Sequence, residues 1–283
     1  MKQHILVCPF EPPLISRLQG QTLVVHVEDV LLIPRVKEQV ERHNRLHCIQ
    51  VISSHPLARL ELTPEMKAIP IAAYVPEVGE GGEFYEKLPL LRQLGLQVYL
   101  AAIGKTNIRD ARILSSLGIA TALVMEGVPL DWDAMEDLLV YFAYGKSRHA
   151  NIEPFNYVIS NYSRTSMVDF SSVYFDNPNR YLHVEGDGRI ALSAKDAQAG
   201  VFIGELDSID AIADDPRYKE RRDKAERFFL EGAGCAYCGA FRVCLGKFSA
   251  QRDANPGCEK LFAKLMEISE NQKIRDGVVL WQP

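Results

Sequence analysis

In the N-terminal half of the chain, short apolar runs alternate with amphipathic stretches. The runs are four to eight residues long and rich in β-branched residues, which predicts buried strands at 4–8, 22–27, 46–52, 69–75, 96–103 and 119–125. Between most of them, apolar residues recur at spacings of three and four, which predicts helices at 30–44, 83–95, 107–118 and 131–144. Asp131 is the expected N-cap of the last helix.

This alternation of strand and helix predicts parallel βα units and therefore an α/β fold. Six strands can form either a partial barrel or an open sheet, and the periodicity does not choose between the two.

From about residue 165 the pattern changes. Residues 181–193 predict a β-hairpin with Gly186-Asp187-Gly188 at its turn. Asp215 and Pro216 predict a helix start, with Asp as N-cap and Pro in the first turn. That helix is expected to reach about residue 230 and carries six Lys or Arg. These charges indicate either a solvated face or a basic surface beside an anionic site.

Composition limits the classes of protein to consider. The 283 residues are 47% apolar and 24% charged, which is typical of an ordinary folded protein. No apolar run approaches the ~20 residues of a membrane span, and the N-terminal sequence has no signal-peptide pattern, so we expect a cytoplasmic protein without a membrane partner. The net charge of -5 argues against a nucleic-acid partner.

Four of the six cysteines lie close together near the C-terminus, with the spacing C-x2-C-x5-C-x13-C: Cys235, Cys238, Cys244 and Cys258. In a reducing compartment such clustered thiols favour metal binding over disulfides. Four thiolates suit either a [4Fe–4S] cluster or Zn²⁺. The split second half, unlike the paired knuckles of zinc ribbons, favours iron–sulfur. Cys8 and Cys48 lie within apolar strands and are expected to be buried core residues.

The cysteine spacing resembles the second half of the SPASM domain, the C-terminal extension of radical S-adenosylmethionine (radical SAM) enzymes that modify peptides and proteins. That domain binds two auxiliary [4Fe–4S] clusters through C-x9–15-G-x4-C, then C-x2-C-x5-C-x3-C and a later Cys. The four cysteines match the ligands of its second cluster, whereas Ser193 and Phe248 stand where ligands of the first would be. The resemblance covers roughly residues 175–270 and implies a single [4Fe–4S] cluster.

Radical SAM enzymes also carry C-x3-C-x2-C after the first strand, whereas here no second cysteine follows Cys8 in that loop. The resemblance therefore implies a degenerate partial (β/α)6 radical-SAM-like barrel over residues 1–164, followed by a small C-terminal SPASM-type iron–sulfur domain over 165–283. We expect no reductive cleavage of S-adenosylmethionine and no stand-alone enzyme activity.

The function implied by the resemblance is that of a non-catalytic iron–sulfur partner of a radical SAM/SPASM maturase in peptide or protein maturation. A precedent is the set of proteins called GeoRSP, in which a separate SPASM-domain protein accompanies a radical SAM/SPASM enzyme and a PqqD-like carrier. The resemblance to it implies a PqqD-like peptide carrier and a precursor peptide as further partners. The expected docking face is the basic helix, through Arg221, Arg222, Lys224 and Arg227. Two alternatives stay open: a zinc-stapled peptide- or protein-binding module, and a barrel enzyme of unrelated chemistry.

Overall fold

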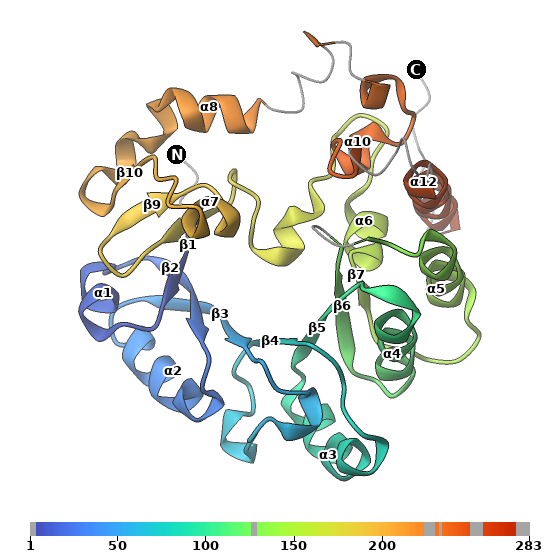
Figure 1. Cartoon of the computed structure of the whole chain (residues 1–283), viewed down its shortest axis with the longest axis horizontal. Coiled ribbons are helices and arrows are strands. Elements are labelled where there is room, and N and C mark those ends of the chain that lie inside the picture. Colours follow the sequence, from blue (N-terminus) through green and yellow to red (C-terminus); the bar gives the residue numbers. More distant parts are fainter. Residues whose placement is uncertain (1–3, 126–128, 224–229, 232–233, 250–256, 276–283) are drawn as a thin grey trace. The chain divides into compact units, whose positions relative to one another are not determined.

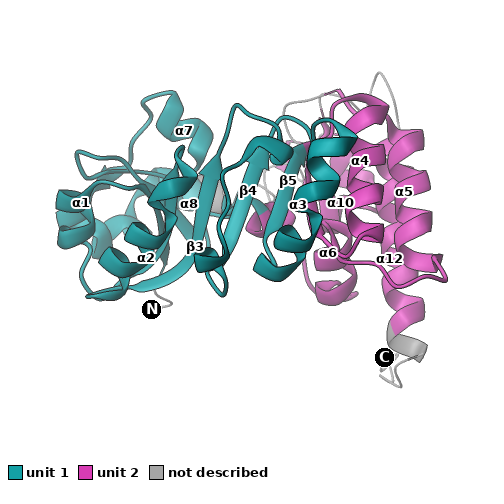
Figure 2. Cartoon of the chain, turned by 90° about the horizontal axis from the view of Figure 1, so that it is seen from below, with its two compact units in different colours: residues 1–100, 174–223 teal, residues 101–173, 224–283 magenta. Residues whose placement is uncertain are grey.

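The computed structural model describes residues 4–125, 129–223, 230–231, 234–249 and 257–275 (Figure 1). The chain divides into two compact units, coloured separately in Figure 2. Unit 1 comprises Met1–Leu100 and Tyr174–Asp223, and unit 2 comprises Ala101–Val173 and Lys224–Pro283. Each unit draws on residues from both sides of position 164, and the domain boundary expected there stays a prediction.

Unit 1 is built on a mostly parallel sheet whose strands run in the order β10-β9-β8-β1-β2-β3-β4-β5. Strands β1 to β5 pair in parallel with their neighbours, and β8 adds a further parallel partner to β1. The antiparallel pairs among the described strands of this unit are β8–β9 and β9–β10. The strands are Ile5–Pro9 (β1), Thr22–Val27 (β2), Arg45–Ile52 (β3), Ile71–Val75 (β4), Gln97–Ala101 (β5), Tyr181–Val184 (β8), Arg189–Ala191 (β9) and Gly204–Glu205 (β10).

Three helices of unit 1 lie on one side of the parallel strands (Figure 1): α1 (Pro12–Arg17), α2 (Ile33–Glu41) and α3 (Gly81–Leu94). Each of them buries several apolar side chains, as expected of helices that cover a parallel sheet. Shorter helices complete the unit: α7 (Ala194–Gln198), α8 (Pro216–Arg222) and the 3-10 turns Val30–Leu32, Leu57–Arg59, Pro64–Met66 and Leu206–Asp214.

Unit 2 combines two parallel strands with a group of helices. The strands are β6 (Ala120–Val124) and β7 (Ile152–Glu153). The long C-terminal helix α12 packs against α5 and α6. The helical segments are α4 (Gly104–Ser116), α5 (Trp132–Tyr144), α6 (Phe155–Asn161), α10 (Phe241–Cys244), α12 (Gly257–Arg275) and the 3-10 turns η4 (Phe170–Tyr174) and η6 (Gly234–Tyr237). No helix in the described part of the chain is both long and apolar enough to cross a membrane.

The predicted α/β class and all six predicted strands are confirmed, with ends shifted by no more than a few residues. The Asp131 side chain accepts a hydrogen bond from the Ala134 amide at 2.9 Å, so the predicted N-cap of α5 is also confirmed. The helix expected at 30–44 is instead a 3-10 turn followed by α2, because Pro34 is best accommodated in the first turn of a new helix.

In the C-terminal half, the predicted hairpin is the antiparallel pair β8–β9. The predicted helix does begin at Pro216, with the carboxylate of Asp215 accepting from the Arg217 amide at 2.8 Å. This helix, α8, ends at Arg222, and residues 224–229 lie outside the described residues, with Lys224 and Arg227 among them. The side chains of Arg221 and Arg222 are not described either, so the docking face stays a prediction.

The core of unit 2 is a cluster of four aromatic side chains that come from distant parts of the sequence. Phe248 stacks on Phe262 and Phe170, with ring centroids 5.6 and 6.3 Å apart. Trp132 meets Phe248 edge-on at 5.3 Å. All four rings are buried. Such contacts add to the free energy gained from burying the rings themselves.

We expect the substitution Phe248→Ala to lower the free energy of unfolding by about 3–5 kcal/mol, because it leaves a cavity among three rings. The matched control is Tyr237→Ala: this ring is 83% exposed, and its loss should change the stability by less than about 0.5 kcal/mol. Urea unfolding of the two variants and the unsubstituted chain measures both effects. Equal midpoints for both variants would contradict the assigned core.

Candidate metal centre

The first three cysteines of the motif lie on a run of tight turns in unit 2. Cys235 lies in η6, and its carbonyl accepts a hydrogen bond from the Cys238 amide at 3.1 Å. The Cys238 carbonyl in turn accepts from the Phe241 amide at 3.0 Å, at the start of α10. Cys244 is the last residue of α10. These local bonds keep three thiols within a short, compact path of backbone.

The chain then reverses sharply. Leu245 and Gly246 both have left-handed backbone, with φ of 50° and 73°. A non-glycine residue in this region costs roughly 1–2 kcal/mol, so surrounding contacts must hold Leu245 there. One such contact is the hydrogen bond from the Lys247 amide to the Cys244 carbonyl, at 3.0 Å. The turn therefore directs residues 247–249 away from α10 and toward the aromatic core.

Contacts with residues 164–171 anchor the cysteine segment. The amide of Val168 donates to the carbonyl of Arg242 at 2.9 Å, and the Arg242 guanidinium donates to the carbonyl of Arg164. The ammonium of Lys247 lies 3.4 Å from a carboxylate oxygen of Asp169 and also donates to the Ser171 hydroxyl. Because Lys247 is mostly buried, this pairing is shielded from solvent and holds the turn after Cys244 in place.

The fourth cysteine, Cys258, arrives on a separate element. It is the second residue of α12 and is buried. A thiolate in the first turn of a helix is stabilised by the helix dipole. Gly257, just before it, packs so closely on Trp132 that a Cβ atom there would lie 2.4 Å from the Trp132 side chain. This close approach determines where α12, and with it Cys258, begins.

The thiol of Cys244 lies near the other three cysteines of the motif. Burial raises the pKa of this thiol to about 12, and the charges of Cys238, Cys258 and Cys235 act in the same direction. Charges act on a thiol in this way only when they lie nearby. Cys235, Cys244 and Cys258 are buried and Cys238 is half-buried. The predicted ligands are thus gathered in one neighbourhood of unit 2, and none of them is in a disulfide.

A bound metal cation would favour the ionised form of these thiols. A thiol that resists ionisation, as that of Cys244 does, becomes a thiolate when it coordinates a metal, since a coordinating thiol loses its proton outright. The donor set therefore fits a thiolate-bound metal or cluster. In the described ranges, no three or more His, Cys, Asp or Glu side chains are already arranged to hold a single metal ion.

The two positions at which the family resemblance places ligands of another cluster have structural roles here. Phe248 is 2% exposed and forms the centre of the aromatic core. Ser193 is 1% exposed and is the N-cap of α7, where its hydroxyl accepts from the Asp196 amide at 3.0 Å. Neither residue supplies a soft thiolate ligand.

Cys8 and Cys48 are buried, as predicted, and lie on β1 and β3 with β2 between them. Burial raises the pKa of both thiols to about 12; the charge of Glu11 adds to the effect at Cys8, and a backbone hydrogen bond at Ala72 opposes it at Cys48. Both are therefore neutral thiols in the core of unit 1.

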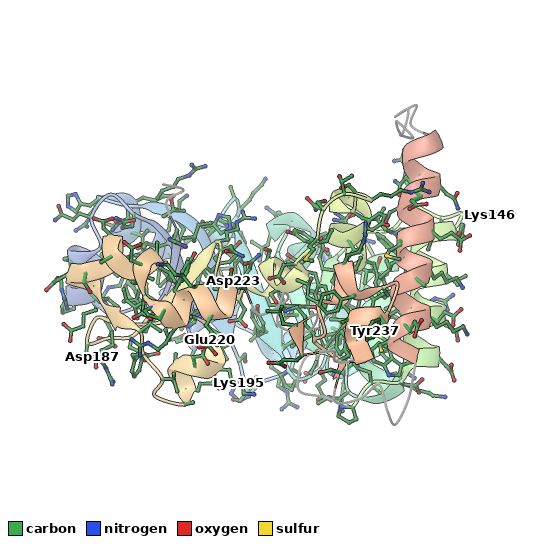
Figure 3. The ribbon with its side chains drawn as sticks, turned by 90° about the horizontal axis from the view of Figure 1, so that it is seen from above. Lys146, Asp187, Lys195, Glu220, Asp223 and Tyr237 are labelled. Carbon is green, nitrogen blue, oxygen red and sulfur yellow. The ribbon has the colours of Figure 1, made fainter. Side chains whose placement is uncertain are left out.

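The sequence analysis missed three residues that position the centre: Lys247, Trp132 and Gly257. Gly257 carries a detectable signal, because a glycine directly before a helix-starting cysteine indicates close packing. Trp132 and Lys247 carry no such signal in the sequence, since the residues that they contact are far away along the chain. Tyr237, between the first two cysteines and labelled in Figure 3, is 83% exposed.

Comparison with known proteins supplies no name for this arrangement. The sequence matches no model of a known protein family, and none of the curated proteins matches it. The resemblance based on cysteine spacing therefore rests on the residues themselves.

Proposed function

We propose that this protein is a non-catalytic, SPASM-type iron–sulfur partner of a radical SAM maturase that modifies a peptide or protein. Its parallel βα units would be a degenerate relative of the radical SAM barrel, and the segment from residue 165 would be the iron–sulfur part. The observation that carries the proposal is the spacing of Cys235, Cys238, Cys244 and Cys258, which matches the ligands of the second SPASM cluster. The position of the other three cysteines near Cys244 supports it.

The pattern of retained and missing cysteines supports one cluster. All four residues that match the second SPASM cluster belong to unit 2. The positions that match the first cluster belong to a buried ring and a helix cap. A set of losses confined to one cluster is expected of a protein that has kept a single centre in use.

A [4Fe–4S] cluster bound by these thiolates would supply one-electron transfer or structural support. The chain's own contribution is to hold the ligands in place. Cys244 is fixed by the turn at Leu245 and by Lys247, and Cys258 by the contact between Gly257 and Trp132. Because the four thiolates leave no ligand position open, we expect the centre to bind no substrate directly, as in closed structural metal sites.

We expect the protein purified without oxygen to contain about four iron and four sulfide per chain. Cys238→Ala should lose most of the iron, since it removes one ligand at a half-buried position. Cys48→Ala is the control: it removes a buried thiol of unit 1 and should keep the full iron content. Iron, zinc and sulfide analysis measures the outcome. One equivalent of zinc without iron would favour the zinc-binding alternative and contradict the proposal.

A second prediction concerns the start of α12. Gly257→Ala would place a Cβ atom 2.4 Å from Trp132, so the first turn must shift and move Cys258 with it. We expect iron to be lost to a chelator several times faster than from the unsubstituted protein. Gly239→Ala is the matched control, because nothing lies within 4 Å of its added Cβ, although it follows Cys238 directly. Equal rates in both variants would rule out a positioning role for Gly257.

A third prediction concerns catalysis. The loop after β1 has no second cysteine, so the three-cysteine site that cleaves S-adenosylmethionine is missing. We expect the purified chain, reduced with dithionite, to form no 5′-deoxyadenosine from S-adenosylmethionine. Chromatography of the reaction mixture checks this. Formation above the level of a protein-free control would show that the chain is itself a radical enzyme.

A further inference from the structure

Unit 1 carries a second chemically distinctive feature, a continuous series of polar side chains on its parallel sheet. These side chains come from neighbouring strands and from the segment before β8: His26 on β2, Gln50 on β3, Tyr74 on β4, Tyr99 on β5, His183 on β8 and Asp176. Strands of a parallel sheet are normally apolar on both faces. A polar series across five of them is therefore unusual, and the cysteine centre in unit 2 does not explain it.

The series is connected by contacts along the sheet. His26 lies opposite Gln50 in the β2–β3 register. The Gln50 amide donates to the Tyr74 hydroxyl at 3.2 Å. Tyr74 stacks on Tyr99, with ring centroids 4.2 Å apart. The four side chains therefore lie on the same face of β2, β3, β4 and β5.

The segment before β8 closes the series at its other end. The His183 imidazole lies 3.2 Å from a carboxylate oxygen of Asp176, and its charge acts on His26. Tyr99 contacts Phe175, whose ring centroid is 6.4 Å away. Phe175 itself has left-handed backbone, with φ of 58°, which is rare for a bulky residue. This backbone turn presents Asp176 to the polar face.

Two buried atoms of the series lack a hydrogen-bond partner among the described residues: Gln50 Oε1 and His183 Nε2. Both side chains are only 5% exposed. The contact of His183 with Asp176 is close but lacks the alignment of a hydrogen bond. Leaving one buried polar atom without a hydrogen bond costs about 1–3 kcal/mol. Two such atoms on one face of the sheet therefore indicate that a bound molecule supplies the missing hydrogen bonds.

The charge of the polar face favours ligands that donate hydrogen bonds over ligands that accept them. Mainly through burial, the pKa of His26 is lowered to about 4. His26 is therefore neutral at pH 7. Burial raises the pKa of Tyr74, so this hydroxyl is neutral too. Asp176 contributes a carboxylate, and Gln50 a carbonyl oxygen.

We propose that this polar face is a binding site for a small organic cation with several N–H donors, of the amidine or guanidine class. Gln50 Oε1 accepts one N–H group of the ligand, and the Asp176 carboxylate balances its charge. Planar cations of this class match carboxylates well because they present parallel donors. The stacked rings of Tyr74 and Tyr99 favour a flat ligand. The Asp176 carboxylate and the Gln50 oxygen disfavour a carboxylate ligand, because both would repel its oxygens.

The test uses two flat probes of the same size and opposite chemistry, benzamidine and benzoate. Calorimetric titration of the full chain at pH 7 is expected to show binding of benzamidine and none of benzoate. Gln50→Met keeps the side-chain volume and removes the acceptor, and it should weaken benzamidine binding about tenfold. Asp176→Asn should weaken it at least as much. Gln50→Met also removes the donor to the Tyr74 hydroxyl, so urea unfolding of this variant is measured beside the titration to show that its fold is kept.

Asp187→Asn is the matched control, since this carboxylate lies in the exposed turn of the β8–β9 hairpin (Figure 3). It should leave the affinity unchanged. Absence of benzamidine binding, equal binding of benzoate, or equal affinity of the Gln50 and Asp187 variants would each overturn the proposal. The polar face would then be a structural network completed by water. None of these outcomes depends on iron, so they are distinguishable from failure of the proposed iron–sulfur function.

Discussion

The aromatic core of unit 2 is the interaction on which the cysteine centre depends. Trp132, Phe170, Phe248 and Phe262 come from four separate stretches of chain and stack into one buried group. Phe248 follows the turn after Cys244, and Trp132 supports Gly257 at the start of the helix that carries Cys258. One packed cluster therefore positions both parts of the motif. Burial of large rings supplies free energy that holds these two parts of the motif in place.

The same packing explains why one or two cysteine substitutions would not create a second metal centre. The residue in the fourth position of the cysteine motif is Phe248, and replacing it with a thiol would empty the middle of the aromatic core. Ser193 also has a structural role, because its hydroxyl accepts a hydrogen bond from the Asp196 amide at the start of α7. Both side chains therefore have structural roles in the fold.

Much of the fold could be predicted from the sequence, because the strands are buried runs with a clear period. The parallel pairing of β8 with β1 could not, since it joins residues far apart in the chain through backbone hydrogen bonds that leave no mark on composition. The four cysteines were predictable as a set because their spacing is characteristic. The residues that position them were not: Lys247 meets Asp169, and Gly257 meets Trp132, only after the chain has folded. The polar face of unit 1 was missed because each residue appears alone within an apolar strand.

The pairing of β1 with β8 also has a consequence for how the protein is made. The first strand emerges early from the ribosome, but one of its edges has no partner until Tyr181–Val184 has been synthesised. During that interval an apolar strand edge is open to pairing with other chains. The β8–β9 hairpin closes this edge, so completion of the hairpin, rather than of the first βα units, marks the point at which the nascent sheet is protected from aggregation.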